Sequence, residues 1–197
     1  MTNPQSPPAG AHTPRYVVVT ILDGTDKAVM SIKSRLAEHG YEVIIFQSRG
    51  TPAIEELAKA GMLVGAIDFI ACEPSIIQNS KLKTQNSIHL PRLVVPVCIE
   101  FNTDDLHGVE AARTIARRLN DALSPVVVMV PTEGISRPTI EGDKFLKQFM
   151  QSLSAKVQLI TIEADVNSSR FANRVADEFL RMVGGSAPAH REGSSLA

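Results

Sequence analysis

Residues 125–130 read Pro-Val-Val-Val-Met-Val, an almost continuous apolar run that is short for a helix. Such runs are typical of strands buried on both faces of a parallel sheet, because these strands lack the polar alternation of half-exposed ones. We predict further strands at 16–21, 41–46, 64–71, 92–99 and 156–162. Pro96, inside one of them, indicates a bulge, an edge strand or an early end.

Segments with helical periodicity lie between these runs. Within 27–39, Val29, Ile32 and Leu36 share one helical face, and Gly40 stands where a helix would end. Further helices are predicted at 53–60, 104–123, 143–153 and 170–183. Buried strands that alternate with helices predict a doubly wound, Rossmann-like α/β sandwich of three layers, with a mainly parallel sheet of about six strands.

Length and charge narrow the class of protein. The chain has 197 residues, 44% of them hydrophobic, and a formal net charge of -1. We expect a single α/β domain at 15–183 between flexible tails at 1–14 and 184–197. The near-neutral balance argues against nucleic acid as a partner, and no apolar run reaches the roughly 20 residues of a membrane-spanning helix.

Cysteine usage points to a compartment. Cys72 and Cys98 do not form a Cys-x-x-Cys pair, so neither a disulfide framework nor a structural zinc site is predicted. The first fourteen residues lack the basic start and apolar stretch of a secretory signal. We therefore expect a cytoplasmic location.

Ligands of doubly wound sheets bind where the carboxyl ends of the strands meet. Ser48, Arg49, Gly50 and Thr51 follow the second predicted strand at a helix start, where backbone N–H groups and an arginine can hold an anion. The same residues also suit an ordinary turn with a helix cap. Because neither GxGxxG nor GxxxxGK[ST] occurs, no dinucleotide or P-loop motif decides between these readings.

Carboxylates also follow several predicted strands, at Glu73, Glu100, Glu133, Glu163 and Asp165. Converging carboxylates can act as general acid and base, although acidic loop residues also cap helices or stay solvated. Glu133 is the favoured catalytic candidate because Gly134 beside it permits a tight turn that would aim the side chain inward. Asp165 is the second candidate, and no metal site is predicted.

Ordered stretches of the chain carry a family resemblance. They are 40–46, 50–51, 55–57, 68–73, 125–131 with Gly134 and Ser136, and 163–167 followed by Phe171 and Ala172. In order and spacing they resemble the family of the tomato mosaic virus resistance (replication-inhibitor) protein, a family of ATP-binding-domain proteins of largely unknown function. Only the C-terminal half of the family pattern is matched.

The resemblance implies ATP or another nucleotide as a ligand, and with the strand-end loops it places Glu73, Gly134, Ser136 and Asn167 among the predicted ligand-binding residues. The Gly-Thr-x-Asp-Thr-Lys motif of the N-terminal half has only a shortened counterpart at residues 24–27. We therefore expect a homo-oligomer, or a partner chain that supplies the missing half.

Three functions stay open at this point. The first is binding of a small anionic metabolite or nucleotide. The second is an enzyme that uses Glu133 and Asp165 for acid/base chemistry on a small carboxylate or phosphate substrate. The third is a non-catalytic dimerisation or assembly domain.

Overall fold

The computed structural model describes residues 15–47, 52–71, 90–97, 105–133 and 140–184. Every predicted strand and helix is present within these ranges, with ends that differ from the prediction by a few residues. The strands are β1 (Arg15–Ile21), β2 (Tyr41–Gln47), β3 (Leu63–Ala71), β4 (Arg92–Val97), β5 (Val126–Glu133) and β6 (Val157–Asp165). The helices are α1 (Asp26–Glu38), α2 (Pro52–Lys59), α5 (Asp105–Asn120), α6 (Ile140–Ser152) and α7 (Ser169–Gly184). The two predicted tails lie outside these ranges, apart from Gly184.

The six strands form one sheet in the order β2-β1-β3-β4-β5-β6, and every neighbouring pair is parallel. The predicted doubly wound, three-layer α/β fold is confirmed. Its order is that of flavodoxin-like sheets with one more strand, rather than the 3-2-1-4-5-6 order of the first Rossmann folds. The chain runs outward from β1 to β2 and then returns to β3 on the other side of β1. The switch in strand order therefore lies between β1 and β3.

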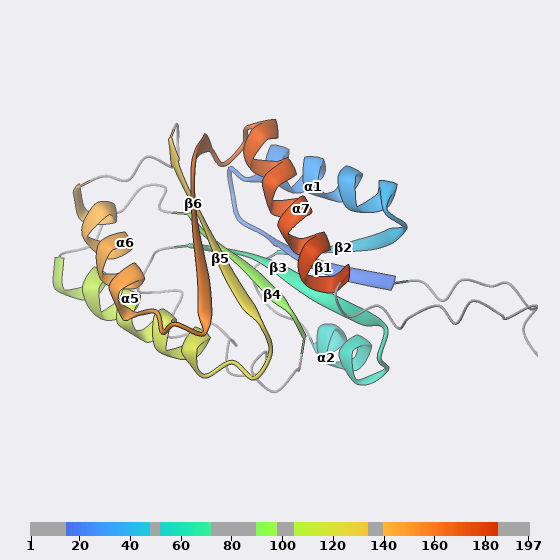
Figure 1. Cartoon of the computed structure of the whole chain (residues 1–197), viewed down its shortest axis with the longest axis horizontal. Coiled ribbons are helices and arrows are strands. Elements are labelled where there is room, and N and C mark those ends of the chain that lie inside the picture. Colours follow the sequence, from blue (N-terminus) through green and yellow to red (C-terminus); the bar gives the residue numbers. More distant parts are fainter. Residues whose placement is uncertain (1–14, 48–51, 72–89, 98–104, 134–139, 185–197) are drawn as a thin grey trace, which may run out of the picture.

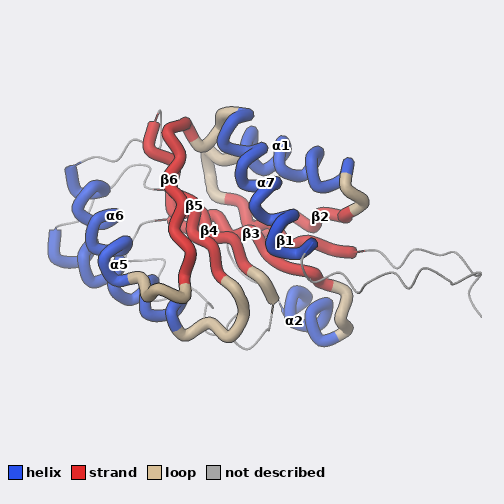
Figure 2. The backbone as a smooth tube through the Cα atoms, viewed as in Figure 1, coloured by secondary structure: helices blue, strands red, loops and turns tan. Residues whose placement is uncertain are grey.

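One face of the sheet is covered by α1 and α7, which lie side by side in Figures 1 and 2. Their apolar sides pack with Val17, Ile67 and other inward residues of the strands into the largest buried cluster. Gly65 of β3 allows this close packing, because a Cβ there would stand 2.8 Å from the ring of Phe179. The helix pair is therefore held tightly over the middle of the sheet.

The opposite face is covered in two parts. Helices α5 and α6 pack on β4, β5 and β6, with the rings of Phe145 and Phe149 stacked 5.9 Å apart. A smaller cluster joins Val18 and Leu63 to partly buried side chains of α2. The two clusters are separate, so the apolar packing on this face is interrupted near β3 and β4.

Pro96 falls inside β4, which is an interior strand between β3 and β5. Pairing with β5 ends at Val94, two residues earlier, whereas pairing with β3 continues to Val97. Of the three outcomes that the proline indicated, the early end is the one observed, on the β5 side. The edge-strand reading is wrong, because β4 is paired with a neighbouring strand on both sides. The proline is tolerated because pairing with β5 has ended before residue 96.

Candidate functional site

A tight turn joins β1 to α1 at the carboxyl edge of the sheet. The Thr25 hydroxyl donates to the carbonyl of Leu22 at 2.7 Å and accepts the Leu22 N–H at 3.2 Å. Gly24 has φ 80°, a left-handed conformation that favours glycine. Because Thr25 is fully buried, this turn holds the N-terminus of α1 in one position beside the end of β1.

Asn167 connects this turn to the other end of the chain. Its side-chain Nδ2 donates to the carbonyl of Gly24 at 2.6 Å, and its Oδ1 accepts the N–H of Ala28 at 3.3 Å. The second bond satisfies one of the first-turn N–H groups of α1, which have no partner within their own helix. Asn167 therefore acts as a cap for α1 that comes from a segment about 140 residues away. Its contacts show a structural role, and ligand binding by Asn167 stays a prediction.

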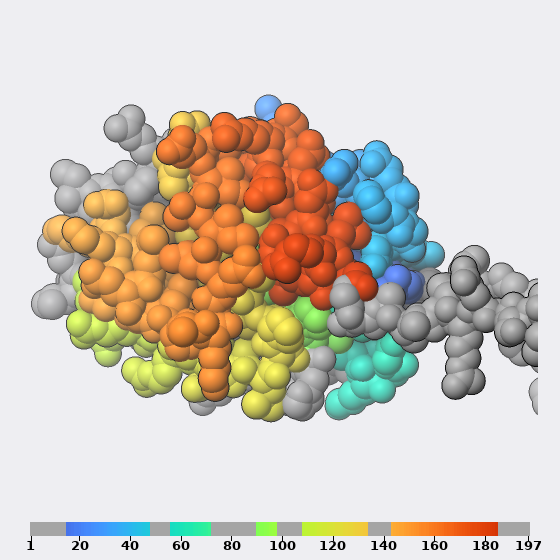
Figure 3. Space-filling view, in the orientation of Figure 1, coloured from blue at the N-terminus to red at the C-terminus, as the bar shows by residue number. Residues whose placement is uncertain are grey.

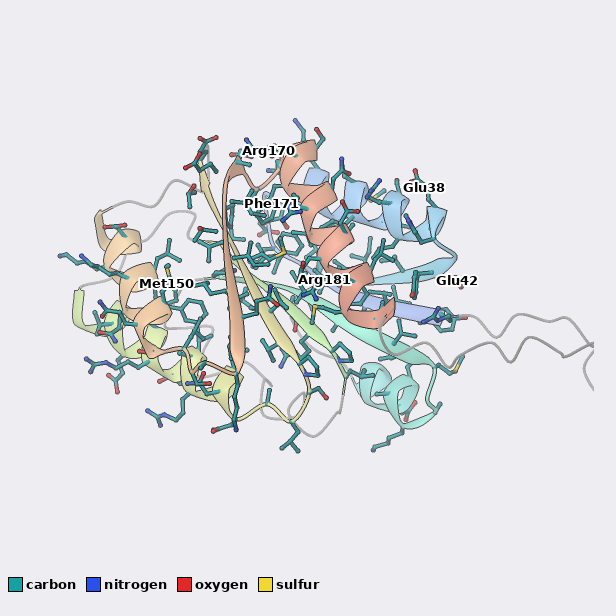
Figure 4. The ribbon with its side chains drawn as sticks, viewed as in Figure 1. Glu38, Glu42, Met150, Arg170, Phe171 and Arg181 are labelled. Carbon is teal, nitrogen blue, oxygen red and sulfur yellow. The ribbon has the colours of Figure 1, made fainter. Side chains whose placement is uncertain are left out.

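The turn from β6 into α7 is equally well bonded. Asp165 accepts the backbone N–H of Asn167 on its Oδ1 at 2.8 Å. Ser168 donates its hydroxyl to the carbonyl of Asp165 at 2.7 Å and accepts the N–H of Phe171 at 3.2 Å. Ser168 is thus a side-chain N-cap for α7. Figure 4 shows Arg170 and Phe171 at this end of the helix, with the Phe171 ring buried in the core.

Glu133 and Asp165 are the last residues of β5 and β6 and stand opposite one another in the strand register. The register shifts between Pro131 and Glu133, where β6 carries an extra residue. Such irregularities re-aim the side chains that follow them. Both residues were predicted in loops; the strands run further than the apolar pattern, and Glu133 is exposed whereas Asp165 is partly buried.

A chain of buried polar groups crosses β1, β3 and β4 at the switch in strand order. The Thr20 hydroxyl donates to Oδ1 of Asp68 at 3.4 Å, and Arg92 donates to Oδ2 of Asp68 from Nε at 3.0 Å and from its second terminal nitrogen at 2.6 Å. Asp68 and Arg92 are 2% and 4% exposed. The pair lies on the face that α2, α5 and α6 cover, between its two apolar clusters.

Sequence reasoning missed Thr20 and Arg92 as interacting residues. Their signal was present, because a charged residue inside a strand expected to be buried on both faces must find a partner of opposite charge. Asp68 and Arg92 both stand in such strands. Their pairing could not be read from the sequence, since it depends on β4 lying next to β3.

Most of the predicted ligand-binding residues lie outside the described ranges. They are Ser48, Arg49, Gly50, Thr51, Glu73, Gly134 and Ser136. Among the described residues, the structure brings Asn167 to the β1–α1 turn, bonds Asp165 to Asn167 and sets Glu133 opposite Asp165. Convergence of the remaining residues on the same place stays a prediction.

The ion pair between Arg181 and Glu178 lies near the C-terminal end of α7. Hydrogen bonding and charge attraction from Glu178 raise the pKa of Arg181, whose side chain lies on the exposed side of α7 (Figure 4). Within the described ranges, no three histidine, cysteine or acidic side chains are grouped as metal ligands would be. No helix in these ranges has the length and apolarity needed to cross a membrane.

Residues 15–79 and 64–183 match the C-terminal domain of an uncharacterised protein family, UPF0261. The chain belongs to this family. It is 23% identical to a UPF0261 protein of Clostridium tetani, over 83% of this chain and 52% of that protein. It is 26% identical to the ToMV resistance protein Tm-1(GCR237) of Solanum lycopersicum, over 84% of this chain and 28% of that protein.

The resemblance to the tomato mosaic virus resistance family, restricted to its C-terminal region, is thereby confirmed. This UPF0261 chain spans about half the length of the bacterial relative. The aligned span of 212 residues is longer than the chain itself, so the relative carries residues that this chain lacks.

Solved structures resemble the UPF0261 chain in fold. The esterase domain of a Rhodothermus marinus protein superposes with a TM-score of 0.55 at 12% identity, over 90% of this chain and 91% of that one. A putative carboxylesterase of Lactobacillus plantarum gives 0.52 at 10% identity, over 89% and 91%. Likeness at this identity shows a shared α/β fold and nothing of the chemistry.

The sequence differs from the motif that is typical of α/β hydrolases. An α/β hydrolase carries a GxSxG nucleophile turn, followed along the chain by an acid and then a histidine. This UPF0261 sequence has no GxSxG, and no histidine occurs between Glu133 and His190. At the end of β6 the side chains are those of Asp165 and Asn167, which are engaged in the turns described above.

Proposed function

We propose that this domain binds a small anionic metabolite, with a nucleotide as the favoured class, at the carboxyl edge of its sheet. The observation that carries the proposal is the β1–α1 turn at the switch in strand order. Doubly wound sheets bind their ligands beside this switch, where a helix N-terminus supplies N–H donors and a partial positive charge. Here the turn is closed by Thr25 and held from outside by Asn167.

Two further facts support a nucleotide. The family resemblance extends to proteins described as carrying an ATP-binding domain, and the predicted anion-binding residues 48–51 follow β2, next to β1 in the sheet. We further propose that the domain works as a homodimer or together with a partner chain. A cytoplasmic location, where nucleotides are abundant, fits this proposal, and we expect neither nucleic acid nor membrane as a partner.

The test is thermal unfolding with a panel of nucleotides and small anions. A ligand present at a hundredfold excess over its dissociation constant stabilises a protein by about 2.7 kcal/mol, which shifts the melting temperature by roughly 5–11 °C in a domain of this size. The matching uncharged nucleoside is the control for the anionic groups. Absence of stabilisation by every nucleotide and anion at millimolar concentration would contradict the proposal.

A pair of variants localises the site. Asn167→Ala removes the amide bridge to the β1–α1 turn. Asn120→Ala is the matched control. Asn120 makes an equivalent two-bond bridge to Ser152 and Ser154, but at the amino ends of the strands. Both variants should lose similar stability, but only Asn167→Ala should weaken ligand binding. Equal affinity in the two variants would place the site elsewhere.

An enzyme is the second candidate, and the pairing of Glu133 with Asp165 favours it. Register partners on neighbouring strands point to the same face, so the two carboxylates can interact. Two carboxylates that face one site can divide the roles of general acid and general base between them. Loss of turnover in Glu133→Gln, at unchanged melting temperature, is the expected result once a substrate is found.

A further inference from the structure

We propose that the outer edge of β2 is the dimerisation surface of this chain, and that it pairs in antiparallel fashion with β2 of a second copy. The two sheets would then form one continuous sheet across a twofold axis. The proposal concerns assembly and does not depend on the ligand proposed above.

Strand β2 is an edge strand of the described sheet, with β1 as its neighbour there. An edge strand presents a row of backbone N–H and C=O groups that another strand can pair with. Natural proteins usually protect such edges with charged residues. The sequence of β2, Tyr-Glu-Val-Ile-Ile-Phe-Gln, has one charge, at Glu42, and four consecutive apolar residues of intermediate exposure, Val43–Phe46.

The other edge strand, β6, differs in this respect. Its central residue Thr161 is exposed, as are Gln158 and Glu163. Polar residues thus recur along β6, whereas the middle of β2 has none. The contrast indicates that β2 is the edge adapted to a partner.

Helix α1 packs over β2 on one face of the sheet (Figure 1). Met30 of α1 is 53% exposed, but it lies on the side of the helix opposite the buried residues Val29, Ile32 and Leu36. It therefore points to solvent and does not contribute to the β2 edge. In Figure 3 the blue atoms of residues 15–47 lie at the upper right of the described part of the chain.

A second copy fits this edge because the strand is complementary to itself. Antiparallel pairing centred on Ile44 sets Val43 opposite Ile45 and Glu42 opposite Phe46 of the other copy, so no like charges face each other. Figure 4 labels Glu42 on β2 and Glu38 at the end of α1. In this register Glu42 faces Phe46 of the second copy and lies away from the Glu42 of that copy. A twofold axis through the strand centre is also the commonest symmetry of homo-oligomers.

The experiment is light scattering after size exclusion, with the full chain at micromolar concentrations. The wild-type protein should have twice the mass of the 21.3 kDa chain. Ile44→Lys places two ammonium groups against each other across the axis and should raise the dimer dissociation constant by about tenfold or more. Ile44→Glu should do the same, and an equal mixture of the two variants should regain the dimer. Thr161→Lys, at the centre of β6, is the matched control and should leave the dimer intact.

Hydrogen exchange keeps the test decisive if the Ile44 variants fold poorly. In the wild-type protein, the amides of β2 should lose protection on dilution below the dissociation constant, while those of β6 should not change. A wild-type monomer at all concentrations, a dimer unaffected by both Ile44 variants, or equal disruption by Thr161→Lys would each overturn the proposal. A monomer that assembles only with a different chain would assign the edge to that partner instead.

Discussion

Replacing Asp68 with asparagine should lower the free energy of unfolding by about 3–5 kcal/mol, because it leaves the Arg92 guanidinium charge buried without its carboxylate. The side chains of Arg92 and Asp68 are 5% and 3% exposed, so water cannot take the place of the lost charge. Asp68 also accepts the hydroxyl of Thr20, and the network ties three neighbouring strands together.

The structure supplies a comparison pair with nearly the same geometry. Arg35 and Asp177 approach to 2.7 Å, but their side chains are 35% and 43% exposed. Solvent screens an exposed pair of this kind, so Asp177→Asn should cost at most about 1 kcal/mol. Burial, and not the distance between the charged groups, sets the difference between the two predictions.

Urea unfolding at neutral pH measures the free energy of unfolding of both variants, and thermal unfolding measures their melting temperatures. In a domain of this size, each kcal/mol corresponds to roughly 2–4 °C in melting temperature, so Asp68→Asn should melt roughly 6–20 °C below the wild type. A double variant, Asp68→Leu with Arg92→Met, removes both charges and should recover much of the loss. Equal destabilisation by Asp68→Asn and Asp177→Asn would refute the reasoning.

Other substitutions test the packing and the candidate site. Asn167→Ala should cost about 1–3 kcal/mol through the unsatisfied N–H of Ala28, and faster hydrogen exchange of that amide is the specific readout. Gly65→Ala should lower the free energy of unfolding by about 1–3 kcal/mol, because the new methyl group meets the Phe179 ring. An unchanged urea midpoint would show that α7 can shift to accommodate the methyl group. Glu133→Gln should leave the free energy of unfolding within about 0.5 kcal/mol of wild type, since the residue is exposed. A large loss of stability there would reveal a structural role.

Secondary structure followed closely from local sequence. Apolar runs such as 125–130 occur where strands are covered on both faces, and the spacing of Val29, Ile32 and Leu36 marks the buried side of α1. These signals are local, because each depends on a few neighbouring residues and on whether their side chains meet water. Gly40 at φ 79° ends α1 as its position indicated.

The candidate site was predictable only in part. The strand-end position of Glu133, Asp165 and Asn167 followed from the order of elements, but the contacts of Asn167 did not. Its partners lie at Gly24 and Ala28, at the other end of the chain, and they meet only because α1 and α7 pack on the same face.

By itself, the sequence determined an α/β chain with buried parallel strands and the family to which it belongs. The tertiary structure decided the order of the strands, the pairing of Asp68 with Arg92 and which strands are left at the edges. The physical reason is that hydrophobic burial is non-directional and can be satisfied in several strand orders, whereas ion pairs, caps and exposed edges depend on which elements become neighbours. From the sequence alone, the apolar run in β2 predicts one more buried strand. Only the position of β2 at the end of the strand order shows that it is an edge strand of the described sheet.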